Sequence, residues 1–279
     1  MSPQQNKPVK TRSWLFTPAT RPERFPKASE AGADVLIVDL EDAVAPGQKD
    51  SARTYVEALL EDSGARLDLP KLAVRINHPH SRFGHDDLSA LAASANFPEF
   101  IVVPKVESAE LIESITALFR DVNKPVRLVP LIESVKGLRH VDAIAACDSV
   151  HGIMFGAADY ASDAHIQPDS LAMQLARCAV ASACAMAAVK AIDAPCFAIH
   201  DADLLHHDLA FAQGNGFAAK AAIHPSHIEA INTAFSPSAE RVDWARRVIA
   251  ASEQGAGVVD GRMVDEAIAR EAREVLSSF

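Results

Sequence analysis

The sequence contains few cysteines, and none has the spacing of a metal site. The four among 279 residues show no CxxC pattern and stand in apolar surroundings: Cys147, Cys178, Cys184 and Cys196. A structural zinc site is disfavoured, because it requires paired or clustered ligands. We therefore expect these side chains to be small buried hydrophobes in a protein of the reducing cytoplasm.

Positive charge and long apolar runs are also scarce. Lys and Arg number 27 against 37 for Asp and Glu, which gives a formal net charge of −10. This balance argues against a nucleic-acid-binding surface, although a local basic pocket for a phosphorylated ligand is compatible with it. No apolar run approaches the roughly 20 residues that a membrane span needs. The polar residues 1–11 predict a short disordered arm without a signal-type apolar segment.

Two motifs that identify common enzyme classes are missing. No GxGxxG follows the first apolar run, and the chain has no GxSxG. The first is the phosphate-binding turn of dinucleotide-binding open sheets, and the second is the nucleophile elbow of serine hydrolases. A doubly wound open sheet and a catalytic serine are both disfavoured.

Eight short apolar runs, each followed by a stretch with helical spacing, dominate what is present. Strands that alternate with helices predict βαβ units and a parallel sheet. Eight units within about 225 residues match a (β/α)8 barrel. We predict an α/β fold, a TIM barrel over residues 12–234, with a C-terminal helical extension over residues 235–279 that acts as a lid or oligomerisation arm. The runs span 13–19, 34–42, 71–77, 99–107, 126–134, 150–159, 195–201 and 217–225.

Polar residues end most of these runs. A charge can simply mark where a strand meets solvent, but in such a barrel the active site lies at the carboxyl ends of the strands. So many cases favour a shared polar pocket. The residues are Asp39, Glu41, Asp42, Arg75, Asn77, Lys105, Glu107, Glu133, Asp159, His200, Asp201 and His224.

Glu133 and Asp159 end neighbouring predicted strands, so their carboxylates can converge. Two carboxylates, with water and substrate oxygens in the other positions, are the usual way to hold Mg²⁺. Arg75 adds a planar fork suited to a carboxylate. These residues predict an anionic, oxygen-rich substrate chelated to a metal, whose carbonyl is polarised as a carbon–carbon bond breaks.

Eight stretches, in order, resemble the citrate lyase beta-subunit-like family of the HpcH/HpaI aldolase superfamily. The resemblance runs from about Arg12 to Leu276. Each motif is weak alone, but the ordered set is highly specific. The stretches are RSWLFTPATRPERFPKA, VLIVDLEDAV, LAVRIN, VVPKVES, LIES, GAADYASD, GFAAKAAIHPSHIEAIN and DGRMVD.

The resemblance implies a trimeric or hexameric TIM barrel that cleaves a 3-hydroxyacyl-CoA to an acyl-CoA and a 2-oxo acid. By position, Glu133 and Asp159 resemble the Mg²⁺ ligands, and Arg75 the binder of the substrate carboxylate. Lys105 and Arg21 resemble contacts to the thioester or CoA phosphates. The acidic cluster of Asp39, Glu41 and Asp42 resembles the family's organiser of metal-bound water.

Asp265 in GRMVD has two compatible interpretations. The resemblance implies that it enters a neighbouring subunit's site as an acid or base, and its position also suits an N-cap of the last helix. The chain departs from the family at Ala158 and Glu266, where an acidic residue and a proline are usual. Histidines 78, 80 and 85 lie on a loop with irregular spacing, and we expect them to face solvent.

The sequence therefore favours a Mg²⁺-dependent acyl-CoA lyase of the malyl-, citramalyl- or citryl-CoA type. Two alternatives remain open at this point. One is a pyruvate-type aldolase that acts on a free hydroxy-oxo acid. The other is a non-catalytic or partner-dependent subunit of a citrate lyase complex.

Overall fold

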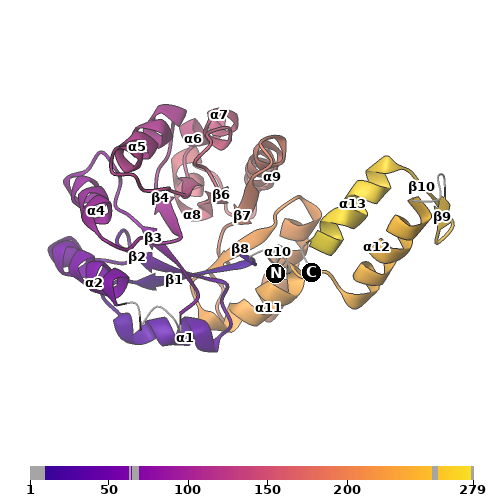
Figure 1. The fold of residues 1–279 in the computed structure, drawn as a ribbon, viewed down its shortest axis with the longest axis horizontal. Coiled ribbons are helices and arrows are strands. Elements are labelled where there is room, and N and C mark those ends of the chain that lie inside the picture. Colours follow the sequence, from indigo (N-terminus) through magenta and orange to yellow (C-terminus); the bar gives the residue numbers. More distant parts are fainter. Residues whose placement is uncertain (1–9, 63, 65–68, 253–256, 278–279) are drawn as a thin grey trace, which may run out of the picture.

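The chain forms a closed barrel of eight parallel strands, described by a computed structural model over residues 10–62, 64, 69–252 and 257–277. The strands follow one another round the barrel in chain order, and β8 pairs with β1 to close it (Figure 1). The predicted TIM barrel is confirmed. The strands are β1 (Ser13–Pro18), β2 (Val35–Asp39), β3 (Lys71–Arg75), β4 (Phe100–Val103), β5 (Leu128–Ile132), β6 (Gly152–Phe155), β7 (Lys190–Asp193) and β8 (Ala219–Ala222).

Helices surround the barrel and bury their apolar faces on it (Figure 1). In α2 (Lys49–Glu61), for example, Ala52, Val56 and Leu60 recur every four residues and are buried. No helix within the described ranges combines the length and apolar character that crossing a membrane requires. The other barrel helices are α1 (Phe25–Glu30), α4 (Arg82–Ala93), α5 (Ala109–Asp121), α6 (Val135–Arg139), α7 (Val141–Ala145), α8 (Ala157–Ala164), α9 (Leu171–Met186), α10 (Ala202–Gly214) and α11 (Ile228–Ala234).

Alternate strand residues fill the barrel interior. Successive side chains of a strand point to opposite faces, so Val35 and Ile37 of β2 join the interior cluster while Leu36 and Val38 pack towards the helices. The largest interior side chain, Trp14, is fully buried, and its ring centroid lies 5.0 Å from that of Phe100. The barrel is therefore a packed core, and only its ends are available for chemistry.

The seventh strand corrects the prediction. β7 spans Lys190–Asp193, not residues 195–201. The apolar pattern misled because the outward-facing residue of this strand is Asp193, which is fully buried against Arg177 and Lys220. Residues 195–201 instead form the loop before α10, where His200 is exposed and Asp201 caps the helix by accepting a hydrogen bond from Leu204 N at 2.9 Å.

The sixth strand is shorter than predicted. β6 ends at Phe155, and Asp159 lies in the first turn of α8. Gly156 ends the extended backbone and precedes that helix. Asp159 therefore reaches the barrel mouth from a helix, not from a strand.

The C-terminal extension consists of α12 (Ala239–Ser252), the hairpin of β9 (Gly257–Val259) and β10 (Arg262–Val264), and α13 (Glu266–Ser277). These elements pack on one another around their own small apolar cluster, which includes Ala245, Val248, Val264 and Ala272. Figure 1 shows them projecting from one side of the barrel, with the hairpin at the far end. The predicted C-terminal helical extension is confirmed in its helices.

The predicted N-terminal arm, residues 1–11, lies outside the described residues except for Lys10 and Thr11. Both contact the amino ends of the strands. Lys71 Nζ donates to Lys10 O at 2.8 Å, and Lys190 Nζ donates to Thr11 Oγ1 at 2.6 Å.

Candidate active site

The turn after β2 carries three carboxylates into the barrel mouth. Asp39 is 1% exposed and Glu41 6%, whereas Asp42 is exposed. Asp39 shapes the turn itself: its Oδ1 accepts from Glu41 N at 2.8 Å, and its Oδ2 accepts from Ala43 N at 3.2 Å. This is the local side-chain-to-backbone pattern that makes aspartate common in turns.

Arg75 at the end of β3 binds this turn. Its Nε and Nη2 donate to the two oxygens of Asp39, both at 2.7 Å, and Nη1 donates to Asp42 at 3.3 Å. Its guanidinium also lies over the Phe16 ring, 4.9 Å from the centroid. Burial alone would lower the pKa of Arg75, but the bonds and charges of Asp39, Glu41 and Asp42 outweigh it and raise that pKa. Arg75 is thus a permanent cation with a fixed orientation.

The bidentate face of Arg75 is therefore occupied by Asp39. The guanidinium has five N–H donors, and Glu41 Oε2, although 3.0 Å from Nη1, accepts no hydrogen bond among the described residues. Nη1 thus contacts Asp42 and Glu41, and the second N–H of Nη2 has no partner among the described residues. The prediction that Arg75 binds a substrate carboxylate stays a prediction, and it rests on this donor and on the positive charge.

Glu133 follows β5 directly and is 4% exposed. Its Oε1 accepts from the backbone N–H of Lys105 at 2.7 Å, and Lys105 Nζ donates to Glu41 Oε1 at 2.9 Å. Lys105 has a φ of 52°, which is strained for a residue other than glycine. In this backbone conformation the Lys105 backbone N–H points to Glu133, and the Lys105 side-chain Nζ reaches Glu41.

Gly156 makes room for Glu133. A Cβ at this position would lie 2.7 Å from Glu133 Cβ and 2.8 Å from Oε2. Because such contacts do not occur between real side chains, only glycine permits this placement of the carboxylate. The φ of Gly156 is −103°, so space and not backbone freedom is the requirement.

Most of these groups, but not Glu41 or Lys105, line one cavity of about 380 Å³ at the carboxyl ends of the strands. Its acidic side carries Asp39, Asp42, Glu133 and Asp159 together with Arg75, and the rest of its wall is mostly apolar, including Phe16, Leu131, Met154, Phe197 and Ile223. A cavity with an apolar wall and few convergent polar groups is typical of a small-molecule site.

The electrostatics of the cavity suit a divalent cation. Burial raises the pKa of Glu133 to about 8, and the nearby charges of Glu41 and Asp159 add to the rise. Burial also raises the pKa of Glu41. With every group ionised, the cluster has a net charge of −2, which one Mg²⁺ ion would neutralise. The members are Asp39, Glu41, Asp42, Glu133 and Asp159, against Lys49, Arg75 and Lys105.

The oxygen donors also suit Mg²⁺, which prefers carboxylates and keeps several water or substrate ligands. The described residues contain no group of three or more His, Cys, Asp or Glu side chains arranged as a complete metal cage. Glu133 and Asp159 are therefore suited to an ion whose coordination is completed by ligands from outside the chain.

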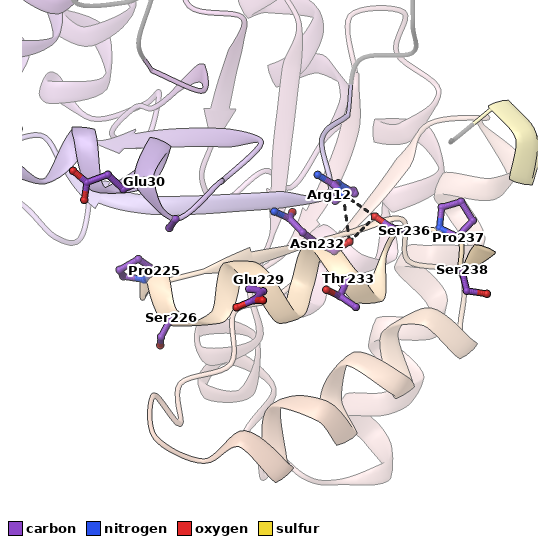
Figure 2. A pocket seen from close by; sticks show the side chains of 11 residues that line it. Arg12, Glu30, Pro225, Ser226, Glu229, Asn232, Thr233, Ser236, Pro237 and Ser238 are labelled. Carbon is purple, nitrogen blue, oxygen red and sulfur yellow. Dashed lines mark hydrogen bonds between the residues drawn. The ribbon is translucent and has the colours of Figure 1, made fainter. Parts of the chain in front are cut away.

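A larger cavity of about 770 Å³ lies elsewhere, along the outside of α11 (Figure 2). Its one cation, Arg12, is committed to neighbours: Nε donates to Asp34 at 2.8 Å, and Nη1 to Ser236 Oγ at 2.7 Å. Figure 2 shows Asn232 and Ser236 gathered round it. The groove borders β1 and α11, and its cation Arg12 has a structural role.

Other predicted site residues lie away from the cavity. Arg21 is exposed on the loop after β1, with Glu23 3.8 Å from it. Asp265 is exposed on the extension and caps α13, since its Oδ1 accepts from Ile268 N at 2.9 Å. Its capping role is confirmed, and within one chain it does not line the cavity. His80 and His85 are exposed as expected, whereas His78 is half-buried.

Sequence analysis missed Gly156, Phe16 and Lys49. Lys49 is 7% exposed and donates to two backbone carbonyls of the acidic turn. In the sequence Lys49 directly follows the acidic segment DLEDAVAPGQ, but a lysine at this position is also ordinary for the start of a helix. Gly156 is a single glycine after an apolar run, and nothing in the sequence indicates that it packs on Glu133.

Comparison with known proteins identifies the family. The model of the HpcH/HpaI aldolase/citrate lyase family matches residues 12–225. This chain belongs to that family. A citrate lyase subunit beta-like protein of Mycobacterium tuberculosis is 38% identical over 273 residues, covering 94% of this chain and 93% of the relative.

Two further relatives come from Cereibacter sphaeroides. A (3S)-malyl-CoA thioesterase is 33% identical over 95% of this chain and 93% of its own length. An L-malyl-CoA/beta-methylmalyl-CoA lyase is 31% identical, again over 95% and 93%. Members of this aldolase/citrate lyase family thus include both lyases and thioesterases of CoA esters.

The solved structure of a relative contains magnesium. The protein CitE of Mycobacterium tuberculosis, in complex with magnesium, acetoacetate and coenzyme A, matches this chain with a TM-score of 0.78 and 34% identity, over 95% of this chain and 96% of CitE. Mg²⁺ binding is therefore confirmed as a property of the family. The donor set of Glu133 and Asp159 fits that ion.

Proposed function

We propose that the protein is a Mg²⁺-dependent carbon–carbon lyase that cleaves a 3-hydroxyacyl-CoA of the malyl-, citramalyl- or citryl-CoA type to an acyl-CoA and a 2-oxo acid. The observation that carries the proposal is the buried Glu133, which shares one cavity with Asp159 and Arg75 and has a raised pKa. A buried carboxylate with a strongly raised pKa in a cleft is a candidate functional group. The CoA-ester lyase and thioesterase relatives supply the reaction class.

Each residue has a role that follows from its contacts. Glu133 and Asp159 would hold the ion, which when bound supplies Lewis-acid stabilisation of negative charge on the substrate oxygens. The remaining Nη2 donor and the positive charge of Arg75 would bind the substrate carboxylate, while Asp39 fixes the guanidinium in place. Lys105, held by Glu41, and the more distant Arg21 would serve the thioester or phosphates of CoA.

The extension completes the proposed site from a neighbouring copy in a homotrimer or hexamer. Asp265 of that copy would protonate the enolate of the acyl-CoA product. The hairpin that precedes Asp265 leaves Val258 70% and Met263 67% exposed, and the cavity rim leaves Phe197 59% exposed. Apolar side chains exposed on both surfaces support a contact between copies.

The experiment compares wild type with Glu133→Gln on malyl-, citramalyl- and citryl-CoA, with Mg²⁺ present or chelated. We expect release of a 2-oxo acid by wild type only with Mg²⁺, and a loss of about 10²–10³-fold in the variant because one ion ligand is gone. The matched control is Glu113→Gln, which alters an exposed carboxylate of α5 that does not line the cavity; it should keep activity within about threefold.

Hydrolysis of the thioester is the second candidate, favoured by the (3S)-malyl-CoA thioesterase relative. Thiol release separates the two reactions, since hydrolysis frees CoA thiol and cleavage of the carbon–carbon bond does not. Thiol without 2-oxo acid would establish the thioesterase. Cleavage of free hydroxy-oxo acids alone would establish the aldolase, and inactivity on all substrates despite Mg²⁺ binding would indicate a partner-dependent subunit.

A further inference from the structure

Lys49, the first residue of α2, is a buried cation without a contacting anion. Its side chain is 7% exposed, yet within the described residues it forms no ion pair. Instead Nζ donates to Leu40 O and to Glu41 O, both at 2.7 Å. Burying an ammonium is unfavourable unless hydrogen bonds compensate for the lost hydration. The hydrogen bonds to these two carbonyls provide that compensation.

The two carbonyls belong to the turn that carries the acidic cluster. From the barrel side, Asp39 holds this turn through the N–H groups of Glu41 and Ala43. From the helix side, Lys49 holds it through its carbonyls. With both peptide groups fixed, the Glu41 carboxylate reaches Lys105 Nζ at 2.9 Å and lies 3.0 Å from Arg75 Nη1.

Lys49 also contributes charge. Burial lowers the pKa of Lys49, and the charges of Asp39, Glu41, Asp87 and Asp42 partly oppose that shift. Its ammonium therefore offsets part of the repulsion among the carboxylates. It does not line the cavity, and it has no hydrogen bond to Glu133 or Asp159.

We propose that Lys49 is a positioning residue of the active site: it fixes the Leu40–Glu41 turn so that Glu41 stays on Lys105 and Arg75. The proposal rests on the proposed function for its kinetic consequence. Without Lys49 the turn loses two hydrogen bonds and the acidic cluster loses a cation, so Glu41 moves away. Lys105 Nζ then loses its carboxylate acceptor and Arg75 loses its ion pair with Glu41, while Asp39 still holds the guanidinium. The backbone N–H of Lys105, which supports Glu133, does not depend on the Leu40–Glu41 turn, so the ion ligands keep their positions.

The test uses Lys49→Met in the full chain, with Lys124→Met as the matched control. Lys124 likewise donates to backbone carbonyls, those of Leu91, Ala92 and Ser94, but at the amino ends of the strands. We expect both variants to lose similar thermal stability. Lys49→Met alone should lose about 10²-fold in kcat, as for a displaced catalytic group.

Mg²⁺ affinity, measured by calorimetry, distinguishes positioning from general loosening. Lys49→Met should bind Mg²⁺ at least as tightly as wild type, because a nearby positive charge has been removed. Lys49→Arg, which keeps the charge and its donors, should recover about tenfold of the lost rate. Should Lys49→Met fail to fold, Lys49→Gln removes the cation and keeps one N–H donor. A loss of about tenfold in kcat without weaker Mg²⁺ binding then supports the proposal, and a fall in Mg²⁺ affinity parallel to kcat overturns it.

Unchanged kcat in Lys49→Met, or Mg²⁺ affinity that falls in parallel with kcat and stability, would overturn the proposal. If wild type cleaves no thioester, the proposed function fails separately. A crystal structure of Lys49→Met then decides the positioning role without activity: Glu41 displaced from Lys105 supports it, and Glu41 in place refutes it.

Discussion

At the scale of single residues, the site depends on a carboxylate placed where its charge is disfavoured. Glu133 is buried beside other carboxylates, and within the part of the chain that the structure describes its one hydrogen bond comes from Lys105 N. A group in this state stores free energy that a cation would release on binding. The absence of a side chain at Gly156 is what permits this arrangement.

Gly156→Ala should therefore damage the ion site more than the fold. The added methyl group would meet Glu133 at 2.7 Å, so the carboxylate must move. We expect Mg²⁺ affinity to fall by roughly 10–100-fold, as when a ligand support is lost. Calorimetric titration measures the affinity. Gly214→Ala is the control, since nothing lies within 4 Å of its added carbon; an equal loss there would refute the steric explanation.

At the scale of elements, a buried group of four charges ties β7 and β8 to α9 and α10. Lys220 and Asp193 are both fully buried. Lys220 Nζ contacts Asp208 at 2.6 Å, and Arg177 bridges Asp193 at 2.6 Å and Asp208 at 2.8 Å. Lys220 also donates to Ala194 O at 2.6 Å, which anchors the loop leading to the apolar rim of the cavity.

Lys220→Met should lower the free energy of unfolding by about 3–5 kcal/mol, because two buried carboxylates would then share one cation. Urea denaturation measures the loss. The control is Lys136→Met, which removes an ion pair with Glu107 that is 66% and 39% exposed; its effect should stay below about 1 kcal/mol. Similar losses in the two variants would mean that burial of the network contributes nothing.

At the scale of the whole molecule, Asp265 lies between β10 and α13 of the extension, which projects from one side of the barrel (Figure 1), whereas barrel residues line the cavity. If the extension serves a neighbouring copy, Asp265→Ser should lose about 10²-fold in kcat, the effect of a missing general acid. Thermal stability should be unchanged, because serine still caps α13. Enzyme kinetics and thermal melts measure the two effects.

A mixing experiment tests the sharing of sites directly. Asp265→Ser mixed with Glu133→Gln, after subunit exchange, should recover part of the wild-type rate, since some sites then combine an intact cavity with an intact Asp265. Glu133→Gln exchanged with itself is the control. If subunits exchange but the rate does not recover, Asp265 of one copy does not take part in the reaction at a neighbouring copy's site.

The sequence by itself determined the barrel, the family and most of the acidic mouth. Eight apolar runs with helical stretches between them fix a βαβ repeat, and polar residues at their ends fall on one face because parallel strands share direction. Local order along the chain is enough for these inferences. It was also enough to predict Glu133 and Asp159 as ion ligands suited to Mg²⁺.

Only the tertiary structure decided what depends on contacts between distant segments. β7 was misplaced because the charges of Asp193 are buried by Arg177 and Lys220, partners 16 and 27 residues away. Gly156 matters only because Glu133 packs on it, and Lys49 only because α2 folds back on the turn after β2. A pattern along the chain records hydrophobicity and spacing, whereas burial and hydrogen-bond partners exist only once the chain has closed on itself.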